Sequence, residues 1–263
     1  MSAPIRSVAI LTVESLTVRF GGLVALNALD FDLRAGEFVG LIGPNGSGKT
    51  TFFNALTGIY APAAGSVTLS ETDITGLRPQ RIYDAGITRT FQRLRLASTL
   101  SVFDNLMIGN HRNLDQSLMT NIFARRRLHQ QIMEDIEKSR VLLEQFSAPL
   151  ASRLFDPVSQ LPMIDRRRVE VCRALISKPK ILLLDEPSAG MTHEETRALM
   201  DDLLASREQM PGLAIVLIEH EMGVIERVTD RCVVLNYGQK IAEGSYRDVA
   251  DDSRVRAAYL GED

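Results

Sequence analysis

The chain has 263 residues, of which 45% are hydrophobic, and its formal net charge at pH 7 is −3. This length allows one large domain, or a core with a subdomain, and the apolar content allows a substantial buried core. The small negative charge argues against nucleic acid as a partner, and no segment approaches the roughly 20 apolar residues of a membrane span, so we expect a soluble chain.

The N-terminal region is predicted to be β structure that leads into one helix. Between residues 11 and 40, short alternating runs are punctuated by Gly21-Gly22 and by Ala35-Gly36, which predicts hairpins. A buried strand is expected over 38–42 and a helix over 49–56. Strand pattern resumes after a stretch that contains Gly and Pro.

The middle of the chain has helical character. From about residue 94 to residue 154 strand signals vanish, and Leu128, Ile132, Ile136 and Leu143 fall along one side of a predicted helix. This spacing indicates a helical subdomain.

The last third alternates helices with short apolar strands. A helix is expected over 165–176, and apolar strands are expected in KILLLDEP (180–187) and LAIVLIEH (213–220), each followed by another helix. Two short strands then surround the sequence RCVVLNYGQKIAEG. Apolar strands separated by helices indicate a parallel sheet covered on both faces. Cys172 and Cys232 fit no metal or disulfide spacing and are expected to be small buried residues in a reducing compartment.

A glycine-rich loop follows the strand at 38–42 and matches the pattern G-x-x-x-x-G-K-[ST]. Such a loop points several backbone N–H groups at one anion, and the positive end of the following helix adds to the attraction. We expect the lysine to neutralise the β and γ phosphates and Thr50 to hold Mg²⁺. The candidate phosphate-binding residues are Gly43, Asn45, Gly46, Ser47, Gly48, Lys49, Thr50 and Thr51.

Two adjacent carboxylates end the apolar run at 181–184, and ligands bind at such carboxyl ends of parallel strands. Asp185 is expected to hold Mg²⁺ through water, and Glu186 is expected to polarise the attacking water. His220 closes the next apolar strand at the same edge of the sheet, where it can sense a γ-phosphate. The other histidines lie in polar stretches and are expected to be exposed.

These motifs together resemble those of the ATP-binding cassette (ABC) transporter ATPases, and the resemblance covers nearly the whole chain. It implies an α/β P-loop NTPase core with an antiparallel β subdomain and an inserted helical subdomain. The core would comprise residues 1–92 and 165–263, and the helical subdomain residues 93–164. The resemblance also implies that Phe20 stacks on adenine. Gln92 would contact Mg²⁺ or the attacking water, and the residues after it would line a groove for the permease.

The segment Leu161-Pro162-Met163-Ile164-Asp165 departs from the family's Leu-Ser-Gly-Gly-Gln signature, which completes the ATP site of the opposite subunit. Proline lacks a hydroxyl and an N–H donor, and side chains replace glycines where close backbone approach is needed. The carboxylate of Asp165 adds repulsion toward a phosphate. The segment still suits a helix start, with Ser159 or Gln160 as the expected cap. An alternative register uses Ser159 as the signature serine.

The resemblance is strongest to ATPases that power uptake of branched-chain and related amino acids. It implies hydrolysis of ATP with Mg²⁺, membrane permeases as partners, and a periplasmic binding protein as an indirect partner, at the cytoplasmic face of the inner membrane. The altered signature predicts an asymmetric heterodimer with a second ATPase chain. Two alternatives are an ATPase of the same fold for urea, lipid or polysaccharide, and a nucleotide-binding regulatory subunit with little turnover.

Overall fold

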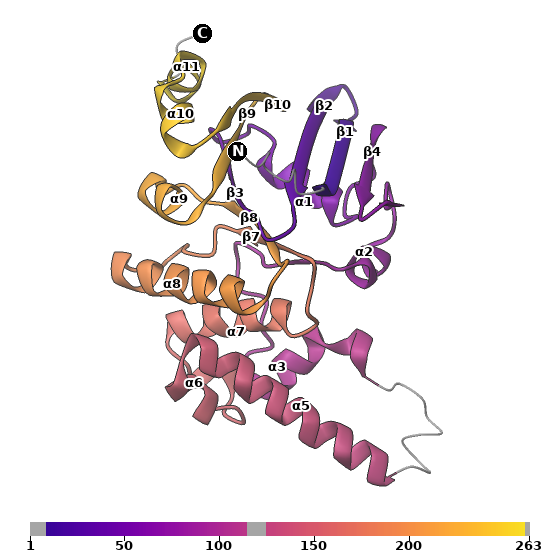
Figure 1. The fold of residues 1–263 in the computed structure, drawn as a ribbon, viewed down its shortest axis with the longest axis vertical. Coiled ribbons are helices and arrows are strands. Elements are labelled where there is room, and N and C mark those ends of the chain that lie inside the picture. The colour runs from indigo at the N-terminus through magenta and orange to yellow at the C-terminus, as the bar shows by residue number, and fades with distance from the viewer. Residues whose placement is uncertain (1–8, 115–124, 261–263) are drawn as a thin grey trace, which may run out of the picture. The chain divides into compact units, whose positions relative to one another are not determined.

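The computed structural model describes residues 9–114 and 125–260 (Figure 1). The chain divides into two compact units. The first unit contains residues 1–89, 180–186 and 210–263, and the second contains residues 90–179 and 187–209. Each unit is described by itself below.

An antiparallel sheet begins the first unit, in the strand order β2-β1-β4-β5. Strands β1 and β2 form a long hairpin whose turn contains Gly21, with a φ of 58°. This hairpin confirms the β structure that the alternating pattern predicted. The four strands are β1 (Ala9–Phe20), β2 (Leu23–Arg34), β4 (Ala64–Leu69) and β5 (Thr72–Asp73).

The second sheet of the first unit has the order β10-β9-β3-β8-β7-β6. Neighbouring strands from β9 to β6 are parallel, as predicted, but β10 pairs antiparallel with β9 because a tight turn joins the two. The predicted parallel sheet therefore carries one antiparallel strand at this edge. The strands are β3 (Phe38–Ile42), β6 (Ile87–Arg89), β7 (Ile181–Asp185), β8 (Ala214–Ile218), β9 (Arg231–Asn236) and β10 (Gln239–Gly244).

One hydrophobic core joins both sheets to helix α1 (Lys49–Leu56), which has the predicted bounds. Phe52 and Phe53 of this helix are fully buried, and the Phe52 ring packs edge-on against Phe31 at 5.1 Å between centroids. Burying each ring contributes about 1.5–3 kcal/mol. This packing fixes α1, and therefore the loop before it, against the sheets. The other helices of the unit are α2 (Pro79–Ala85), α9 (Met222–Val228), α10 (Tyr246–Asp251) and α11 (Ser253–Leu260).

The named elements of the second unit are helices in the residues that the structure describes. The helical character predicted from about residue 94 to residue 154 falls within this unit. Helix α3 packs on α7, and α5 packs on α6 and α8. Its helices are α3 (Val102–Gly109), η1 (His111–Asn113), α5 (Arg125–Phe146), α6 (Ala148–Ser152), η2 (Val158–Gln160), α7 (Met163–Leu175) and α8 (His193–Gln209).

The buried face of α5 differs from the predicted one. Leu143 is buried as expected, but Ile132 is 41% exposed, and the buried stripe continues through Ser139 and Phe146 instead. Helix α6 follows α5 directly and packs on its C-terminal turns, so the burial is concentrated at that end.

Helix α7 begins two residues before the predicted start at residue 165. Its N-cap is Pro162, and no side chain caps it, so the expected capping by Ser159 or Gln160 was wrong. Ser159 and Gln160 belong instead to the short helix η2. The guanidinium of Arg166, in α7, donates to the carbonyls of Ser159 and Leu161, each at 2.8 Å, and these bonds tie the preceding turn to the start of α7.

Both cysteines are buried and unpaired, as predicted. Burial raises the pKa of the Cys172 thiol well above its ordinary value. Within residues 9–114 and 125–260, no helix combines the length and the apolar character needed to cross a bilayer.

Candidate functional site

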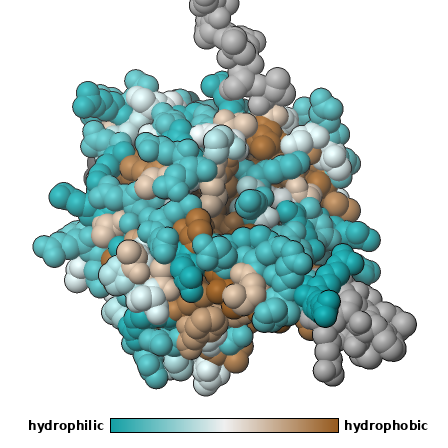
Figure 2. All heavy atoms as spheres, turned by 60° about the horizontal axis from the view of Figure 1, so that its bottom comes forward, coloured by the Kyte–Doolittle hydropathy of each residue, from teal (hydrophilic) through white to brown (hydrophobic). Residues whose placement is uncertain are grey.

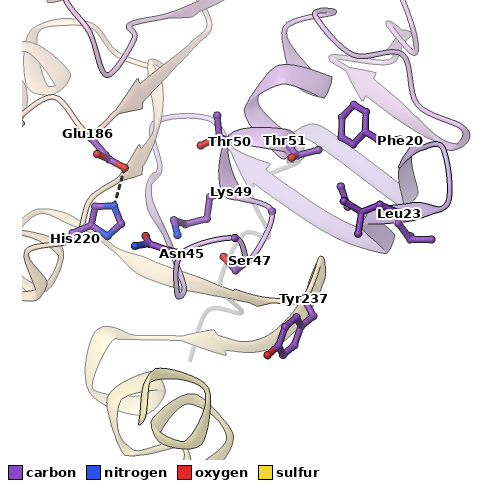
Figure 3. Close-up of a pocket in the computed structure, with 14 residues that line it drawn as sticks. Phe20, Leu23, Asn45, Ser47, Lys49, Thr50, Thr51, Glu186, His220 and Tyr237 are labelled. Atoms are coloured by element: carbon purple, nitrogen blue, oxygen red, sulfur yellow. Dashed lines mark hydrogen bonds and ion pairs between the residues drawn. The ribbon is translucent and has the colours of Figure 1, made fainter. Parts of the chain in front are cut away.

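A pocket of about 380 Å³ lies in the first unit, around the glycine-rich loop (Figure 3). Its walls come from β1, β2, the loop, α1, the ends of β7 and β8, and the β9–β10 turn. The lining residues are Phe20, Leu23, Val24, Ala25, Asn45, Gly46, Ser47, Gly48, Lys49, Thr50, Thr51, Glu186, His220 and Tyr237.

The loop needs glycine at two positions where the backbone is left-handed and close to its neighbours. Gly43 has a φ of 146°, and a Cβ there would lie 2.1 Å from the carbonyl oxygen of Leu235. Gly48 has a φ of 106° and is the N-cap of α1, and a Cβ there would lie 2.8 Å from the Leu26 side chain. Only glycine therefore allows the backbone to bend in this way, and the bend lets the loop line the pocket at the N-terminus of α1.

Lys49 provides the buried positive charge of the loop. Its side chain is 7% exposed, and Nζ donates to the carbonyl oxygens of Gly43 at 2.6 Å and Pro44 at 2.9 Å. Burial lowers the pKa of Lys49 from its ordinary value, while the charges of Glu186 and Asp185 oppose this change. A lysine at a helix N-terminus, ringed by backbone groups, is an arrangement suited to binding phosphate.

Phe20 stands at the end of β1 and is 43% exposed, with its ring packed edge-on against Tyr60 at 4.9 Å. It lines the same pocket as the predicted loop residues Asn45 through Thr51. The structure thus brings the predicted aromatic and the predicted phosphate loop together.

Glu186 and His220 meet because β7 and β8 are neighbours in the sheet. Asp185 pairs with Ile218 across the two strands, so the residues that follow each strand emerge side by side. Glu186 Oε1 and His220 Nε2 lie 2.7 Å apart (Figure 3). Glu186 also has a φ of 49°, a strained backbone conformation that clusters at active sites.

Asp185 does not line the pocket but forms a buried ion pair with Arg89. The distance from Arg89 Nη2 to Asp185 Oδ2 is 2.5 Å, and the side chains are 4% and 6% exposed. Arg89 Nη1 also donates to Asn54 Oδ1 of α1 at 2.6 Å. Sequence reasoning missed Arg89 and Asn54, because no local pattern shows that β6 lies beside β7.

Replacing Arg89 with methionine is expected to destabilise the fold by about 3–5 kcal/mol, because it leaves the Asp185 carboxylate buried without its cation. The double variant Arg89→Met, Asp185→Asn removes both charges and should recover much of that loss. Urea unfolding followed by circular dichroism measures both effects. Equal stability of the single variant and the wild type would contradict a structural role for this pair.

Gln92 lies in the second unit, as does the segment Ser188-Ala189-Gly190-Met191. The buried Arg167 of α7 donates to the carbonyl oxygens of Gln92 at 2.8 Å and Ala189 at 3.3 Å. Arg167 therefore ties the backbone of both segments to α7 within that unit.

Of the predicted magnesium ligands, Thr50 lines the pocket, whereas the Asp185 carboxylate is buried against Arg89. Oxygen donors of this kind suit Mg²⁺, which binds through a few protein ligands together with water and phosphate. No group of three or more His, Cys, Asp or Glu side chains placed to hold a metal ion occurs in the described part of the chain.

Sequence reasoning missed Leu23 and Tyr237 in the wall of the pocket. Tyr237 is 75% exposed and has a φ of 45°. A bulky residue before Gly238 in a two-residue turn was the one signal that could have singled it out.

Comparison with known proteins places this architecture in a family. A family model described as "ABC transporter" matches residues 26–189, and one described as "Branched-chain amino acid ATP-binding cassette transporter" matches residues 239–263. The high-affinity branched-chain amino acid transport ATP-binding protein LivG of Salmonella typhimurium is 38% identical, over 96% of this chain and 98% of LivG. BraF of Pseudomonas aeruginosa, which bears the same description, is 36% identical over the same shares.

Solved structures agree with the sequence relatives. A nucleotide-free ATP-binding cassette from an ABC transporter has a TM-score of 0.82 and 29% identity, over 97% of this chain and 100% of its own. An ABC transporter cassette in its ADP conformation has a TM-score of 0.82 and 28% identity. The present chain therefore belongs to the ATP-binding cassettes of the ABC transporter family and is an ATPase subunit.

Proposed function

We propose that this chain binds and hydrolyses ATP to power the import of branched-chain or related amino acids. The names of LivG and BraF support this solute class, and so does the match of residues 239–263 to the branched-chain amino acid cassettes. The observation that carries hydrolysis is the contact between Glu186 and His220 in the pocket that contains the phosphate loop. Urea, lipid or polysaccharide remain the alternative solutes.

Phosphate binding is assigned to the loop and the first residues of α1. The backbone of residues 45–51 and the Lys49 ammonium would hold the β and γ phosphates, because both present positive charge to the pocket. Thr50 and Asp185 would hold Mg²⁺, which when bound offsets the negative charge of the phosphates. Phe20 would stack on the adenine.

Glu186 is proposed as the general base that orients the attacking water and accepts its proton. Its carboxylate lies at the pocket wall, 2.7 Å from His220 Nε2, and its backbone N–H donates to Ile218 O at 2.9 Å. His220 would hold the carboxylate in position and contact the γ-phosphate. The strand ends fix both groups, so little reorganisation is needed at the moment of reaction.

The start of α7 supports a defective signature in this chain. Met163 and Ile164 form its first turn, after Pro162 as the N-cap, so side chains stand where the family has glycine. Ser159, the serine of the alternative register, lies in η2 before that turn. Asp165 is in the first turn and pairs with Arg168 at 3.1 Å, which favours the helix but adds negative charge near a phosphate site.

We therefore propose an asymmetric heterodimer with a second ATPase chain. One ATP site would use Lys49, Asp185 and Glu186 of this chain with an intact signature from the partner. The other site would use the partner's phosphate loop with Met163 and Ile164 of this chain, and would turn over poorly. We also propose that residues 1–92 and 165–263 act as the nucleotide-binding core and residues 93–164 as the helical subdomain.

The isolated chain is expected to hydrolyse ATP slowly, and the chain purified with its partner ATPase is expected to do so much faster. Restoring Ser-Gly-Gly-Gln at positions 162–165 should increase turnover of the isolated chain far more than that of the heterodimer. Phosphate release measured for all four preparations tests this. Fast turnover by the unmodified chain alone would contradict the asymmetric assembly. Negligible turnover in both assemblies would instead favour a regulatory subunit.

Membrane permeases are the proposed partners of the second unit, which would place the chain at the cytoplasmic face of the inner membrane. Leu100 and Phe155 are 41% and 61% exposed, and the Phe155 ring packs on Phe103 at 5.9 Å between centroids. Their segments are joined by a hydrogen bond from the Val158 N–H to Leu100 O. Figure 2 shows one face of the molecule, on which hydrophobic side chains gather among hydrophilic ones. Leu100 and Phe155 are therefore a candidate contact for a permease, and a periplasmic binding protein would act through that permease.

A further inference from the structure

The β9–β10 turn places an aromatic side chain in the wall of the nucleotide pocket. Tyr237 lines this pocket together with Phe20 and Leu23, and 75% of its surface is exposed. Figure 3 shows Tyr237 on a different segment of the wall from Phe20 and Leu23. Phe20, Leu23 and Tyr237 are not among the residues assigned to phosphate binding, so they can contact another part of the ligand.

The backbone of this turn is unfavourable for tyrosine. Asn236 pairs with Gln239 across the two strands, so Tyr237 and Gly238 form a two-residue hairpin loop. Their φ values are 45° and 77°, and positive values at both positions define a turn that favours Asn, Asp or Gly at the first. A bulky residue held in this region is an outlier, and such strain points to a function for the side chain.

The turn is anchored to the pocket on two sides. The Gly238 N–H donates to Ser47 O of the phosphate loop at 2.9 Å, and the Asn27 N–H of β2 donates to Gly238 O at 2.9 Å. A Cβ at Gly238 would lie 2.6 Å from Ala25 O, so the turn also packs closely on β2. The position of Tyr237 relative to the phosphate loop is therefore fixed by backbone hydrogen bonds.

We infer that Tyr237 is a second aromatic contact, besides Phe20, for the nucleoside part of bound ATP. This inference rests on the proposed binding of ATP in this pocket. The apolar side chains of Leu23, Val24 and Ala25 line the same pocket and suit a planar base rather than a phosphate. Stacking uses the face of the base, which all bases share, so Tyr237 contributes to affinity without selecting adenine.

Calorimetric titration of the full-length chain with ATP, GTP and inorganic tripolyphosphate, each with Mg²⁺, tests this inference. Tyr237→Ala and Tyr237→Asn are expected to weaken binding of both nucleotides by about fivefold to a hundredfold, and Tyr237→Phe to retain it. Affinity for tripolyphosphate, which has no base, should not change. Tyr237→Asn should also raise the melting temperature, because asparagine suits the turn. Tyr83→Ala, on α2 outside the pocket, is the control and should bind ATP like the wild type.

Unchanged nucleotide affinity in Tyr237→Ala and Tyr237→Asn, beside a wild type that binds ATP, would overturn this inference alone. An equal loss of tripolyphosphate affinity would also overturn it, because the turn would then act through the phosphate loop. Loss in Tyr237→Phe as large as in Tyr237→Ala would exclude ring stacking. Failure of the wild type to bind ATP would refute the proposed function, and the inference with it.

Discussion

Replacing Glu186 with glutamine is expected to lower steady-state ATP turnover of the assembled transporter by about 10²–10⁴-fold, the contribution typical of a general base. The amide keeps the size of the side chain and its contact with His220 Nε2, which is 2.7 Å from Glu186 Oε1 in the wild type. It cannot accept the proton of the attacking water, so ATP should still bind with nearly normal affinity. Phosphate release and calorimetric titration with ATP measure the two effects separately.

The matched control is Glu221→Gln, a glutamate that follows the neighbouring strand β8 and is the N-cap of α9 without a side-chain cap bond. It should leave turnover unchanged. If Glu186→Gln retained full turnover, another group would have to be the base. A parallel loss of ATP binding would mean that Glu186 holds the pocket together rather than acting on water.

Replacing Lys49 with alanine is expected to weaken ATP binding by about tenfold to more than a hundredfold, the range for losing a hydrogen bond from a charged donor. The lysine is 7% exposed and already has its ammonium held by Gly43 O and Pro44 O, so it is fixed before the ligand arrives. Its removal leaves the negative charges of Glu186 and Asp185 near the loop without this cation. Calorimetric titration of the isolated chain measures the change, independently of any partner.

Lys240→Ala serves as the control for Lys49→Ala, because Lys240 pairs with Glu243 at 2.7 Å on β10 and does not line the pocket. Circular dichroism should show that both variants remain folded. Normal ATP affinity in folded Lys49→Ala would contradict the assigned phosphate site.

The local patterns of this chain predicted its elements well wherever one periodicity dominates. The apolar run at 38–42 and the helix at 49–56 have the predicted bounds, because a buried strand and a glycine-capped helix are specified within a few residues. The start of α7 was predicted less well. The Arg166 side chain donates hydrogen bonds to the carbonyls of Ser159 and Leu161. Helix propensity does not show that a side chain will take these backbone acceptors.

The pocket residues also divide into those that the local sequence indicated and those that it did not. Residues 43–51 are contiguous, so the sequence alone indicated a phosphate loop. The roles of Phe20 and Gln92 came from family resemblance, and only Phe20 lies with that loop in the first unit. Arg89, which pairs with the predicted Asp185, carried no local signal, and Tyr237, which lines the pocket, carried only that of its turn position before Gly238.

The sequence by itself determined which segments become strands, where the glycine-rich loop bends, and which charged groups follow the strands. Only the tertiary structure decided that β3 lies between β8 and β9, that Arg89 neutralises Asp185, and that the Tyr237 turn is anchored to Ser47. Hydrophobic periodicity and turn chemistry depend on a few neighbouring residues, so they can be read from a short stretch of sequence. Strand order and buried ion pairs depend on packing and hydrogen bonds between segments far apart in the chain, and these form only when the whole core assembles.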